Sequence, residues 1–496
     1  MAKTSDSAAA KAPRATSNRS TVPTSDGFQQ YIASNWADRP DVAPDAREQA
    51  DFAAARRLLI SGKFPGKRLI IPAGGAKVRS NDTDYAYRAH SAFSHLTGWA
   101  SDSVPGSVLV MQPTDSGHEA TLYFRSPAGR ESNEFYANPE IGEFWVGPRP
   151  SIAHVAADLG VATSDLSEFE AIIDSVDANT LILREGDRDL TDAVDGRRLL
   201  AADTESLETE GDIDLARELS EIRLVKDPYE IEQMRMAVAA TKQGFDDIIG
   251  DLPAIVAHER GERLVEGTFN RRARAEGNTV GYDTIAASGP HACILHWVRN
   301  DGPVVPGDLI LIDAGIELDS LYTADITRTL PVSGTFTEVQ RRVYEAVREA
   351  ADAAFAIVKP GIRFSDVHAE AMRVIAEKTA EWGLLPVSAE ESLQPEAQYH
   401  RRYMVHGTSH HLGIDVHDCA QARRELYREG ILEPGMVFTI EPGLYFQPDD
   451  LTVPEEYRGI GVRIEDNIVV TEAGAENLSI GIPRTADDVE AWLAAS

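Results

Sequence analysis

The residues best suited to chemistry lie toward the end of the chain, where five side chains could together hold two divalent cations. They are four carboxylates and one imidazole: Asp313, Asp325, His410, Glu441 and Glu465. The carboxylates carry four negative charges and a neutral imidazole carries none, so the set balances two divalent ions. A pair of ions about 3.5–4 Å apart can bind and activate water for amide hydrolysis. Oxygen-rich ligands with one imidazole favour manganese or a similarly hard ion over a thiolate-type zinc site.

Two of these carboxylates lie on a predicted pair of strands. The run DLILIDAG (308–315) has four apolar residues before Asp313, as expected of a strand that is buried on both faces. In the next predicted strand, Asp325 shares one face with three threonines, Thr323, Thr327 and Thr329. A turn that contains Gly315 allows the two strands to pair as a hairpin, which brings both aspartates to one place. Taken alone, either aspartate is more often a turn or salt-bridge residue.

The other two carboxylates also arrive at strand ends. Glu441 follows the apolar run MVFTI and precedes a Pro-Gly pair. Glu465 shares one face of the last predicted strand with Arg463, while Ile464 points to the other face. An Arg-x-Glu pair is usually a cross-strand ion pair, and the neighbouring Asp466 strengthens that alternative.

One segment punctuated by glycines, MVHGTSHHLGIDVHD (404–418), contains four histidines within twelve residues: His406, His410, His411 and His417. A solitary buried histidine is generally a core residue with satisfied hydrogen bonds. Four in one segment, in a chain with 13 histidines, indicate a site. His296, in the run CILHW, is a fifth candidate.

Composition narrows the possible functions. At 496 residues the chain is too long for one compact core, so two domains are expected. The formal net charge of −32 argues against a nucleic-acid partner. It indicates solubility, with a salt-adapted or metal-concentrating surface as the alternative. The two cysteines, Cys293 and Cys419, make no disulfide framework and favour a reducing cytoplasm. No apolar run is long enough to predict a membrane span.

The hydrophobic pattern divides the chain into four parts. Residues 1–44 are expected to form a disordered tail, a targeting peptide being the weaker alternative. Residues 45–205 begin with an amphipathic helix (45–61) and continue with four strand-like runs that alternate with helical stretches, as in an α/β domain: KRLIIPAG, GSVLVMQP, EATLYFRS and NTLILREG. The acidic residues 206–216 are taken as a linker.

Residues 217–488 are predicted to form an α+β domain of antiparallel strands covered by helices. The stretch after the linker indicates one long or broken helix, with Asp227 as N-cap and Pro228 at its first position. A second helix begins at a capping box at Thr337, and a third begins at Ser365. Between and after these helices lie two strand pairs, DLILIDAG with LYTADITRTL and GMVFTIEPG with GVRIEDNIVV.

In their order, these segments resemble the creatinase/methionyl aminopeptidase superfamily with its pita-bread catalytic fold (peptidase family M24), and within it the Xaa-Pro aminopeptidases (aminopeptidase P). The matching stretches in the carboxy-terminal domain are CILHW, LILIDAG, ADITRTLPVSGTF, HGTSHHLGIDVHD, ILEPGMVFTIEPGLY and YRGIGVRIEDNIVV. Upstream, RSNDTDYAYRAHSAFSHLTGW (79–99) is similar to the creatinase-like amino-terminal domain of that family. The resemblance covers residues 45–485.

The resemblance implies a role for each candidate residue. The five metal ligands would be Asp313, Asp325, His410, Glu441 and Glu465, with Asp325 and Glu465 bridging two ions, most readily Mn²⁺. A hydroxide between the ions would attack the peptide carbonyl, with Glu441 as general base. The remaining catalytic candidates are His296, His406, His417, Tyr445 and Arg463. The two aspartates are twelve residues apart instead of the family's eleven, so we expect an extra residue in the hairpin turn.

This resemblance implies a metallo-aminopeptidase that releases the first residue from peptides with proline in second position. The main alternative is prolidase, which cleaves only Xaa-Pro dipeptides. A more remote one is a metal-free interaction module on the same fold, although such a module would be expected to have lost ligands. We expect a cytoplasmic homo-oligomer (dimer or tetramer) that acts on peptides, with no nucleic-acid or membrane partner.

Overall fold

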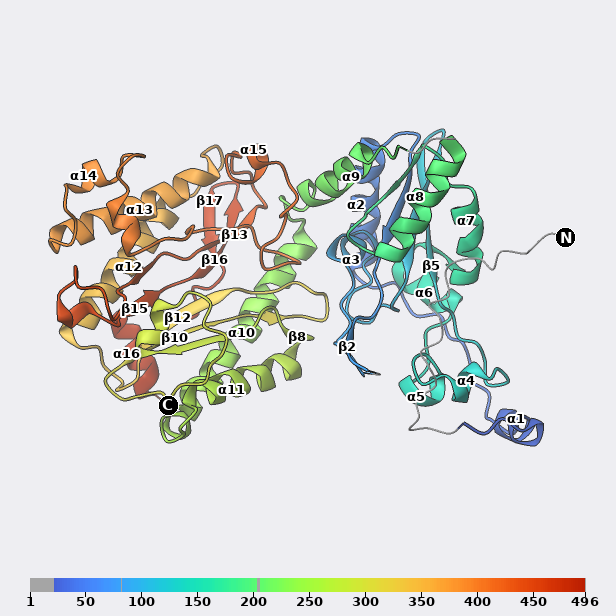
Figure 1. Ribbon diagram of the computed structural model, residues 1–496, viewed down its shortest axis with the longest axis horizontal. Coiled ribbons are helices and arrows are strands. Elements are labelled where there is room, and N and C mark those ends of the chain that lie inside the picture. Colours follow the sequence, from blue (N-terminus) through green and yellow to red (C-terminus); the bar gives the residue numbers. More distant parts are fainter. Residues whose placement is uncertain (1–21, 82, 203–205, 496) are drawn as a thin grey trace. The chain divides into compact units, whose positions relative to one another are not determined.

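The computed structural model describes residues 22–81, 83–202 and 206–495, and the chain divides after Ile222 into two compact units (Figure 1). Each unit has its own sheets and its own core, which confirms the expectation of two domains. In the part of the chain that the structure describes, no helix combines the length and the apolar character needed to cross a bilayer.

The first unit is built on a five-stranded mixed sheet of order β6-β5-β4-β1-β7. Its strand β1 pairs antiparallel with β4 and parallel with β7. All four predicted runs contribute strands, and β6 joins them: β1 (Arg68–Pro72), β4 (Val108–Thr114), β5 (Gly117–Phe124), β6 (Ala162–Asp165) and β7 (Thr180–Ile182). A separate hairpin joins β2 (Val78–Ser80) and β3 (Thr83–Asp84).

Helices cover both faces of this sheet, because successive residues of β1 point to opposite sides. Leu69 and Ile71 enter one apolar cluster, and Ile70 enters another. The predicted amphipathic helix is α2 (Gln49–Lys63), and the architecture is α/β as expected. The other helices are α1 (Asp26–Ala33), α3 (Ser91–Thr97), α4 (Glu134–Ala137), α5 (Glu143–Val146), α6 (Ile152–Leu159), α7 (Glu170–Asp174), α8 (Arg188–Ala202) and α9 (Glu210–Glu221).

Two segments without a clear sequence pattern contain helices. Residues 1–21 of the predicted tail lie outside the described residues, but Asp26–Ala33 forms α1, and Phe28 packs edge-on against Tyr136. Residues 210–216 of the predicted linker lie in α9, because Leu215 and Leu219 lie one turn apart and enter the core of the first unit. The exact domain ends at 205 and 217 stay a prediction.

The second unit is an α+β domain whose strands all pair antiparallel, as predicted. One sheet has the order β12-β10-β9, from β9 (Ile285–Ser288), β10 (Leu309–Ala314) and β12 (Ile326–Pro331). Another has the order β13-β16-β17, from β13 (Val437–Ile440), β16 (Asp466–Thr471) and β17 (Gly474–Asn477). Two short pairs complete it: β8 (Thr279–Val280) with β11 (Ile316–Glu317), and β14 (Gly443–Tyr445) with β15 (Gly461–Arg463).

Two helix pairs accompany these strands (Figure 1). One is α10 (Pro228–Val256) with α11 (Gly261–Glu276), and the other is α12 (Glu338–Ile357) with α13 (Phe364–Glu381). The predicted N-cap at Asp227 and the predicted capping box at Thr337 are both present, and Asp227 also forms a capping box, with Glu230. The stretch predicted to form one long or broken helix is interrupted, between α9 and α10. The shorter helices are α14 (Ala389–Ser392), α15 (Arg424–Tyr427) and α16 (Ala486–Ala494).

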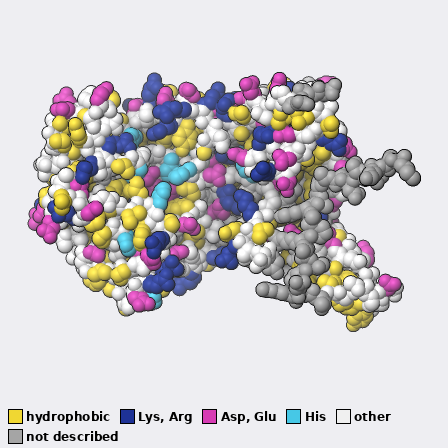
Figure 2. Space-filling model, in the orientation of Figure 1, with side chains coloured by type: hydrophobic (Ala, Val, Ile, Leu, Met, Phe, Trp, Pro, Cys, Tyr) yellow, Lys and Arg dark blue, Asp and Glu magenta, His cyan; other side chains and the backbone are white. Residues whose placement is uncertain are grey.

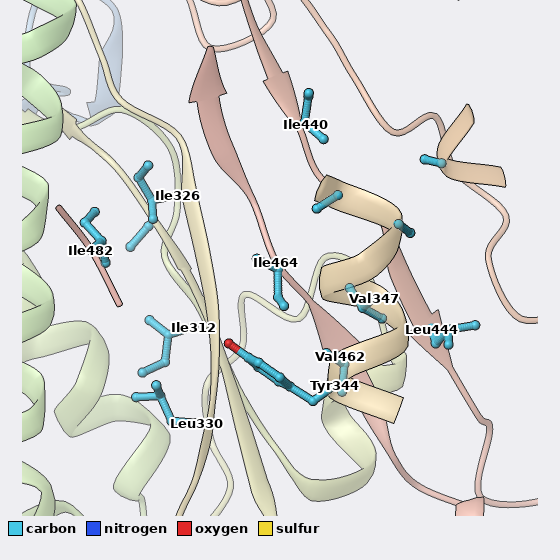
Figure 3. Packing of buried hydrophobic residues seen from close by; sticks show 14 of the residues in the cluster. Ile312, Ile326, Leu330, Tyr344, Val347, Ile440, Leu444, Val462, Ile464 and Ile482 are labelled. Atoms are coloured by element: carbon cyan, nitrogen blue, oxygen red, sulfur yellow. The ribbon is translucent and has the colours of Figure 1, made fainter. Parts of the chain in front are cut away.

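A continuous apolar core joins both strand sets to α12. In Figure 3, Ile312 from the first strand set and Val462 and Ile464 from the second lie around Tyr344 of α12, and Ile326 belongs to the same cluster. Backbone hydrogen bonds also join the sets: the amide of Glu465 donates to the carbonyl of Thr327 (3.1 Å). The two carboxylate-bearing strand pairs are therefore held side by side by the core of one unit.

Candidate metal centre

The four carboxylates come together because each strand pair ends at the same place. Asp313 lies within β10, opposite Thr327 of β12. Asp325 directly precedes β12, Glu441 directly follows β13, and Glu465 lies between β15 and β16. The fully buried pattern of β10 agrees with the strand predicted from DLILIDAG. The turn between the aspartates holds Leu321 at φ 71°, a left-handed conformation that is rare for a bulky side chain.

His410 reaches the same place because its segment runs beside β13. The amide of Thr439 donates to the carbonyl of His410 (3.0 Å), and the amide of Glu441 donates to the carbonyl of Thr408 (2.8 Å). The ring Nδ1 of His410 donates to the carbonyl of His411 (3.2 Å). A carbonyl can only accept, so Nδ1 carries the proton and, in a neutral ring, Nε2 offers a lone pair.

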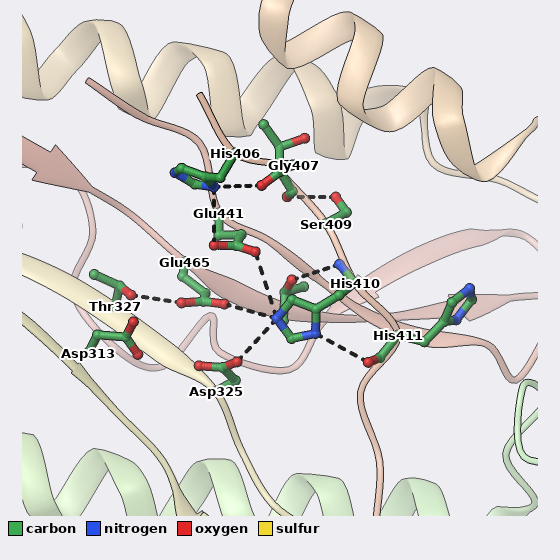
Figure 4. A network of polar contacts seen from close by, with 12 residues as sticks. Asp313, Asp325, Thr327, His406, Gly407, Ser409, His410, His411, Glu441 and Glu465 are labelled. Carbon is green, nitrogen blue, oxygen red and sulfur yellow. Dashed lines mark hydrogen bonds and ion pairs between the residues drawn. The ribbon is translucent and has the colours of Figure 1, made fainter. Parts of the chain in front are cut away.

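That Nε2 atom faces three carboxylates (Figure 4). It lies 3.3 Å from Asp325 Oδ2, 3.7 Å from Glu441 Oε1 and 4.0 Å from Glu465 Oε1. A lone pair surrounded by carboxylate oxygens is repelled by them unless a cation or a proton lies between. The arrangement therefore calls for a positive charge at its centre.

The cluster fits a metal ion by its geometry and by an unsatisfied oxygen. Ligand atoms of Asp325, His410 and Glu465 all lie within 4.8 Å of one another. Glu465 Oε1 is buried and has no hydrogen-bond partner among the described residues, a situation that costs free energy unless something else binds the oxygen. Without an ion, burial and the charges of Asp325 and Glu441 raise the pKa of Glu465 well above its usual value.

His410 supplies part of the missing charge as a proton. Burial alone would lower its pKa, but the hydrogen bond to Asp325 and the charge of Glu441 outweigh burial and raise the pKa to about 9. Burial raises the pKa of Glu441 to about 7, although the positive His410 and Arg463 oppose that shift. Both shifts follow from the negative charge that the cluster concentrates, which a bound cation could neutralise.

Asp313 lies at the edge of the cluster and has partners from the protein itself (Figure 4). Tyr282 donates its hydroxyl to Asp313 Oδ1 (2.6 Å), and Arg463 forms an ion pair with Oδ2 (2.5 Å). Arg463 therefore does form an ion pair with a residue of another strand, as the alternative reading of the Arg-x-Glu pair expects, but the partner is Asp313 of β10.

Arg463 also begins a chain of hydrogen bonds through Tyr445 to His406. Its Nη1 donates to the hydroxyl of Tyr445 (3.2 Å), which lies 2.8 Å from His406 Nε2. His406 Nδ1 lies 2.6 Å from the carbonyl of Gly407, so Nδ1 donates there and Nε2 accepts from Tyr445. Burial lowers the pKa of His406 to about 3, so this ring is neutral. Its Nδ1 is 3.8 Å from Glu441 Oε2, which places His406 beside the cluster.

The remaining two candidate histidines are exposed. The ring of His417 lies 4.4 Å from that of His410, edge to face. The charge of His296 lowers the pKa of His417, after burial and His410, so His296 also lies on this side of the unit. Figure 2 shows histidine side chains gathered on one face of the second unit, among acidic and basic residues.

The sequence pattern did not identify several residues that the structure brings to this region. Tyr282 contacts Asp313 from a segment about thirty residues upstream, without a local motif. Asn467 fixes the backbone of Asp325, since its Oδ1 accepts from the Asp325 amide (3.2 Å). Thr327, which was noted only for its face of the strand, donates its hydroxyl to Glu465 Oε2 (2.7 Å).

Comparison with known proteins agrees with this geometry. Residues 232–472 match the family model described as metallopeptidase family M24, and residues 52–182 match that of the aminopeptidase P N-terminal domain. The chain is 49% identical over 473 residues to Xaa-Pro aminopeptidase 1 of Streptomyces coelicolor, covering 95% of this chain and 92% of the relative. It is 33% identical to Xaa-Pro aminopeptidase of Escherichia coli, covering 90% of this chain and 98% of the relative.

The solved structures give the same result. The low-pH form of aminopeptidase P from E. coli superimposes with a TM-score of 0.77 at 31% identity, covering 91% of this chain and 99% of that chain. A zinc-substituted E. coli aminopeptidase P in complex with product superimposes with a TM-score of 0.75 at 30% identity, covering 91% of this chain and 99% of that chain.

Fold and site together define a two-domain metallo-aminopeptidase with a pita-bread catalytic unit. The chain belongs to metallopeptidase family M24, in its Xaa-Pro aminopeptidase (aminopeptidase P) branch. The family implies divalent metal ions, and the cluster around His410 is the place in the described chain that fits one.

Proposed function

We propose that this enzyme uses two divalent cations to release the first residue from peptides with proline in second position. The observation that carries this proposal is the His410 Nε2 atom, which faces three carboxylates, among them Glu465, whose buried Oε1 has no hydrogen-bond partner among the described residues. The names of the relatives support the Xaa-Pro specificity.

The ligands in this proposal are the five predicted residues, Asp313, Asp325, His410, Glu441 and Glu465. Their oxygen-rich chemistry favours Mn²⁺. Bound there, the two cations would activate the attacking water and polarise the peptide carbonyl. Asp313 fits because Tyr282 and Arg463 already fix its carboxylate beside the others.

Glu441 is the proposed general base. Its carboxylate lies between His410 and His406, with Oε1 3.7 Å from His410 Nε2 and Oε2 3.8 Å from His406 Nδ1. It can therefore accept a proton from the attacking water next to the cluster. Arg463 fixes Asp313 and Tyr445 at the same time and keeps this side of the site positively charged.

The leaving proline nitrogen has no hydrogen in the peptide and must receive a proton before it departs. His406 and His417 are the proposed groups that relay it. His406 is neutral and hydrogen-bonded to Tyr445, so a proton can pass along this pair. His417 is exposed and can exchange protons with solvent. His296 is the third proposed histidine and contacts the substrate from the exposed side.

Cleavage of Gly-Pro and Gly-Pro-Ala, measured after chelation and after adding Mn²⁺ back, tests the proposal. We expect the tripeptide to release glycine only in the presence of metal. Cleavage of the dipeptide alone would favour prolidase. A purified protein that binds no metal would favour the interaction module.

The assembly and the compartment are part of the same proposal. Light scattering on the purified enzyme tests whether it is a dimer or tetramer, and a monomer mass would contradict that expectation. A cytoplasmic location agrees with Cys293 and Cys419, which are both free and buried. Fractionation of the source cells tests it.

A further inference from the structure

The first turn of α11 carries a buried carboxylate that the proposed chemistry does not use. Glu262 has no exposed surface and accepts four hydrogen bonds. Oε1 accepts from the amide of Ser288 (2.8 Å) and from His291 Nδ1 (2.7 Å). Oε2 accepts from Trp297 Nε1 (2.9 Å) and from the amide of Gly302 (2.7 Å). All four donors belong to one segment, residues 288–302.

Neighbouring residues of α11 hold the end of the same segment. The side chain of Asn300 accepts from the amide of Ala286 (2.9 Å) and donates to Glu266 (3.1 Å). Arg263 donates to the carbonyl of Arg299 (3.1 Å). Residues 262, 263 and 266 of one helix therefore fix a loop that has no regular strand or helix after Cys293.

The approach of Glu262 to this loop is close enough to require a glycine. A Cβ added to Gly302 would lie 2.9 Å from Glu262 Oε2 and 2.8 Å from His291 Cε1. The ring of His291 stacks on Trp297 at 3.8 Å between centroids. The ring stack and the four hydrogen bonds give the loop one defined shape.

Between these anchors the loop carries His296. Leu295 and Trp297, on either side of it, pack against the apolar cluster that contains Tyr445. His296 itself is exposed, and its charge acts on His417. The apolar side chains of the loop therefore pack toward Tyr445 of the site, while His296 is exposed.

We propose that Glu262 is a positioning residue for His296, and that the anchored loop sets how the peptide substrate is bound beside the metal centre. This inference rests on the proposed function. Glu262 does not touch the site; it acts by fixing His291 and Trp297, between which His296 lies.

Glu262→Gln tests the proposal with an almost unchanged shape. Each carboxylate oxygen accepts two N–H groups, so an amide group in either position places its own hydrogens against two donors. The loop must loosen to relieve this conflict. Glu276→Gln is the matched control, because Glu276 lies at the other end of α11 and pairs with Arg272 at the surface.

Hydrogen exchange followed by mass spectrometry tests the anchor itself. We expect Glu262→Gln to speed amide exchange in residues 289–302 and to leave residues 309–314 unchanged. Glu276→Gln should match the wild-type protein in both segments. Unchanged exchange in residues 289–302 of Glu262→Gln would overturn the proposal, whatever the activity.

Kinetics test whether the anchor acts through His296. For Gly-Pro-Ala, we expect Glu262→Gln to lower kcat/KM by about 10- to 100-fold, the effect of a displaced substrate contact, with bound metal unchanged. In a His296→Ala background the same substitution should add less than about threefold, because the two residues act on one interaction. If Glu262→Gln lowers kcat/KM by the same factor in the His296→Ala background as in the wild type, Glu262 has a general structural role and the inference is overturned.

Trp297→Phe is the second variant, in case Glu262→Gln does not fold. It keeps a ring on His291 but removes the indole donor, and we expect a smaller loss of kcat/KM with the same dependence on His296. If Trp297→Phe lowers kcat/KM by the same factor with and without His296→Ala, the inference is also overturned. If the wild-type enzyme cleaves no Xaa-Pro peptide, the proposed function fails, whereas an active wild type with an insensitive Glu262→Gln contradicts the inference alone.

Discussion

Glu465 and Asp466 are adjacent buried carboxylates with opposite surroundings. Asp466 forms ion pairs with Arg328 (2.7 Å) and Arg484 (3.0 Å) and accepts from Asn477 (3.1 Å). Burial would raise its pKa, but the two arginines outweigh burial, and the pKa is lowered. Glu465 has an unpartnered oxygen and three other carboxylates nearby, and its pKa is raised well above the usual value.

The difference separates structural from functional carboxylates in one fold. A structural carboxylate receives its positive charge from the same chain, as Asp418 also does from Lys226 (2.9 Å) and Arg223 (3.1 Å). Glu465 is left without such a partner, so its positive charge can come from a bound ion. Asp313 is intermediate, because it lies beside the cluster but is paired with Arg463. Burial alone does not distinguish Glu465 from Asp466; the buried arginine beside Asp466 does.

Removing a metal ligand should have the largest effect on activity. We expect Asp325→Ala to lower kcat/KM by at least about a thousandfold, equivalent to about 4 kcal/mol of transition-state stabilisation. Its fold should persist, because the core and the strand pairing do not depend on this side chain. Peptide cleavage and circular dichroism measure the two quantities. Metal-dependent cleavage at the wild-type rate would remove Asp325 from the ligand set.

Removing the cation from the structural carboxylate should affect stability most. Arg328 is fully buried and also donates to the carbonyls of Thr327 (2.9 Å) and Glu465 (2.7 Å). We expect Arg328→Met to lower the free energy of unfolding by about 3–5 kcal/mol, because Asp466 loses a buried partner. Denaturant unfolding of the metal-free protein measures this. A change below about 1 kcal/mol would show that Arg484 alone satisfies Asp466.

Neutralising Glu465, the functional carboxylate, should change the free energy of unfolding in the opposite direction. In metal-free protein the charge of Glu465 is repelled by its neighbours, so Glu465→Gln is expected to raise the free energy of unfolding, on the order of 1 kcal/mol. Excess Mn²⁺ should make the wild type the more stable of the two proteins, since it gains more binding free energy than the variant. Equal destabilisation by Glu465→Gln with and without metal would contradict the comparison.

The two buried cysteines form a third class of titratable group, which needs no positive partner because a thiol stays neutral. Burial raises the pKa of Cys293 to about 12 and that of Cys419 to about 12. A thiol reacts as the thiolate, so iodoacetamide at pH 8 should leave both unmodified in the folded protein and alkylate both after denaturation. Mass spectrometry of the treated protein measures this, and rapid alkylation of either cysteine in the native state would show an opening of the core.

Local signals in the sequence were enough to predict much of the fold and to select side chains that the structure brings together around His410. The strand DLILIDAG and the helix caps at Asp227 and Thr337 depend on neighbouring residues, and the structure contains all three. The sequence predicts a linker where α9 begins, because the acidic residues there outnumber the apolar ones and the only helical signal is the i, i+4 pair Leu215 and Leu219. Tyr282 and Glu262 could not be found in this way, since their partners are brought to them only by the folded chain.

Calorimetric titration of the chelator-stripped enzyme with Mn²⁺ tests the central claim most directly. We expect the wild type to bind two ions, Glu465→Gln to lose at least one of them, and Glu476→Gln, a surface carboxylate paired with Arg235, to bind as the wild type does. A wild-type protein that binds no divalent cation, or a Glu465→Gln variant with unchanged stoichiometry and affinity, would contradict the account.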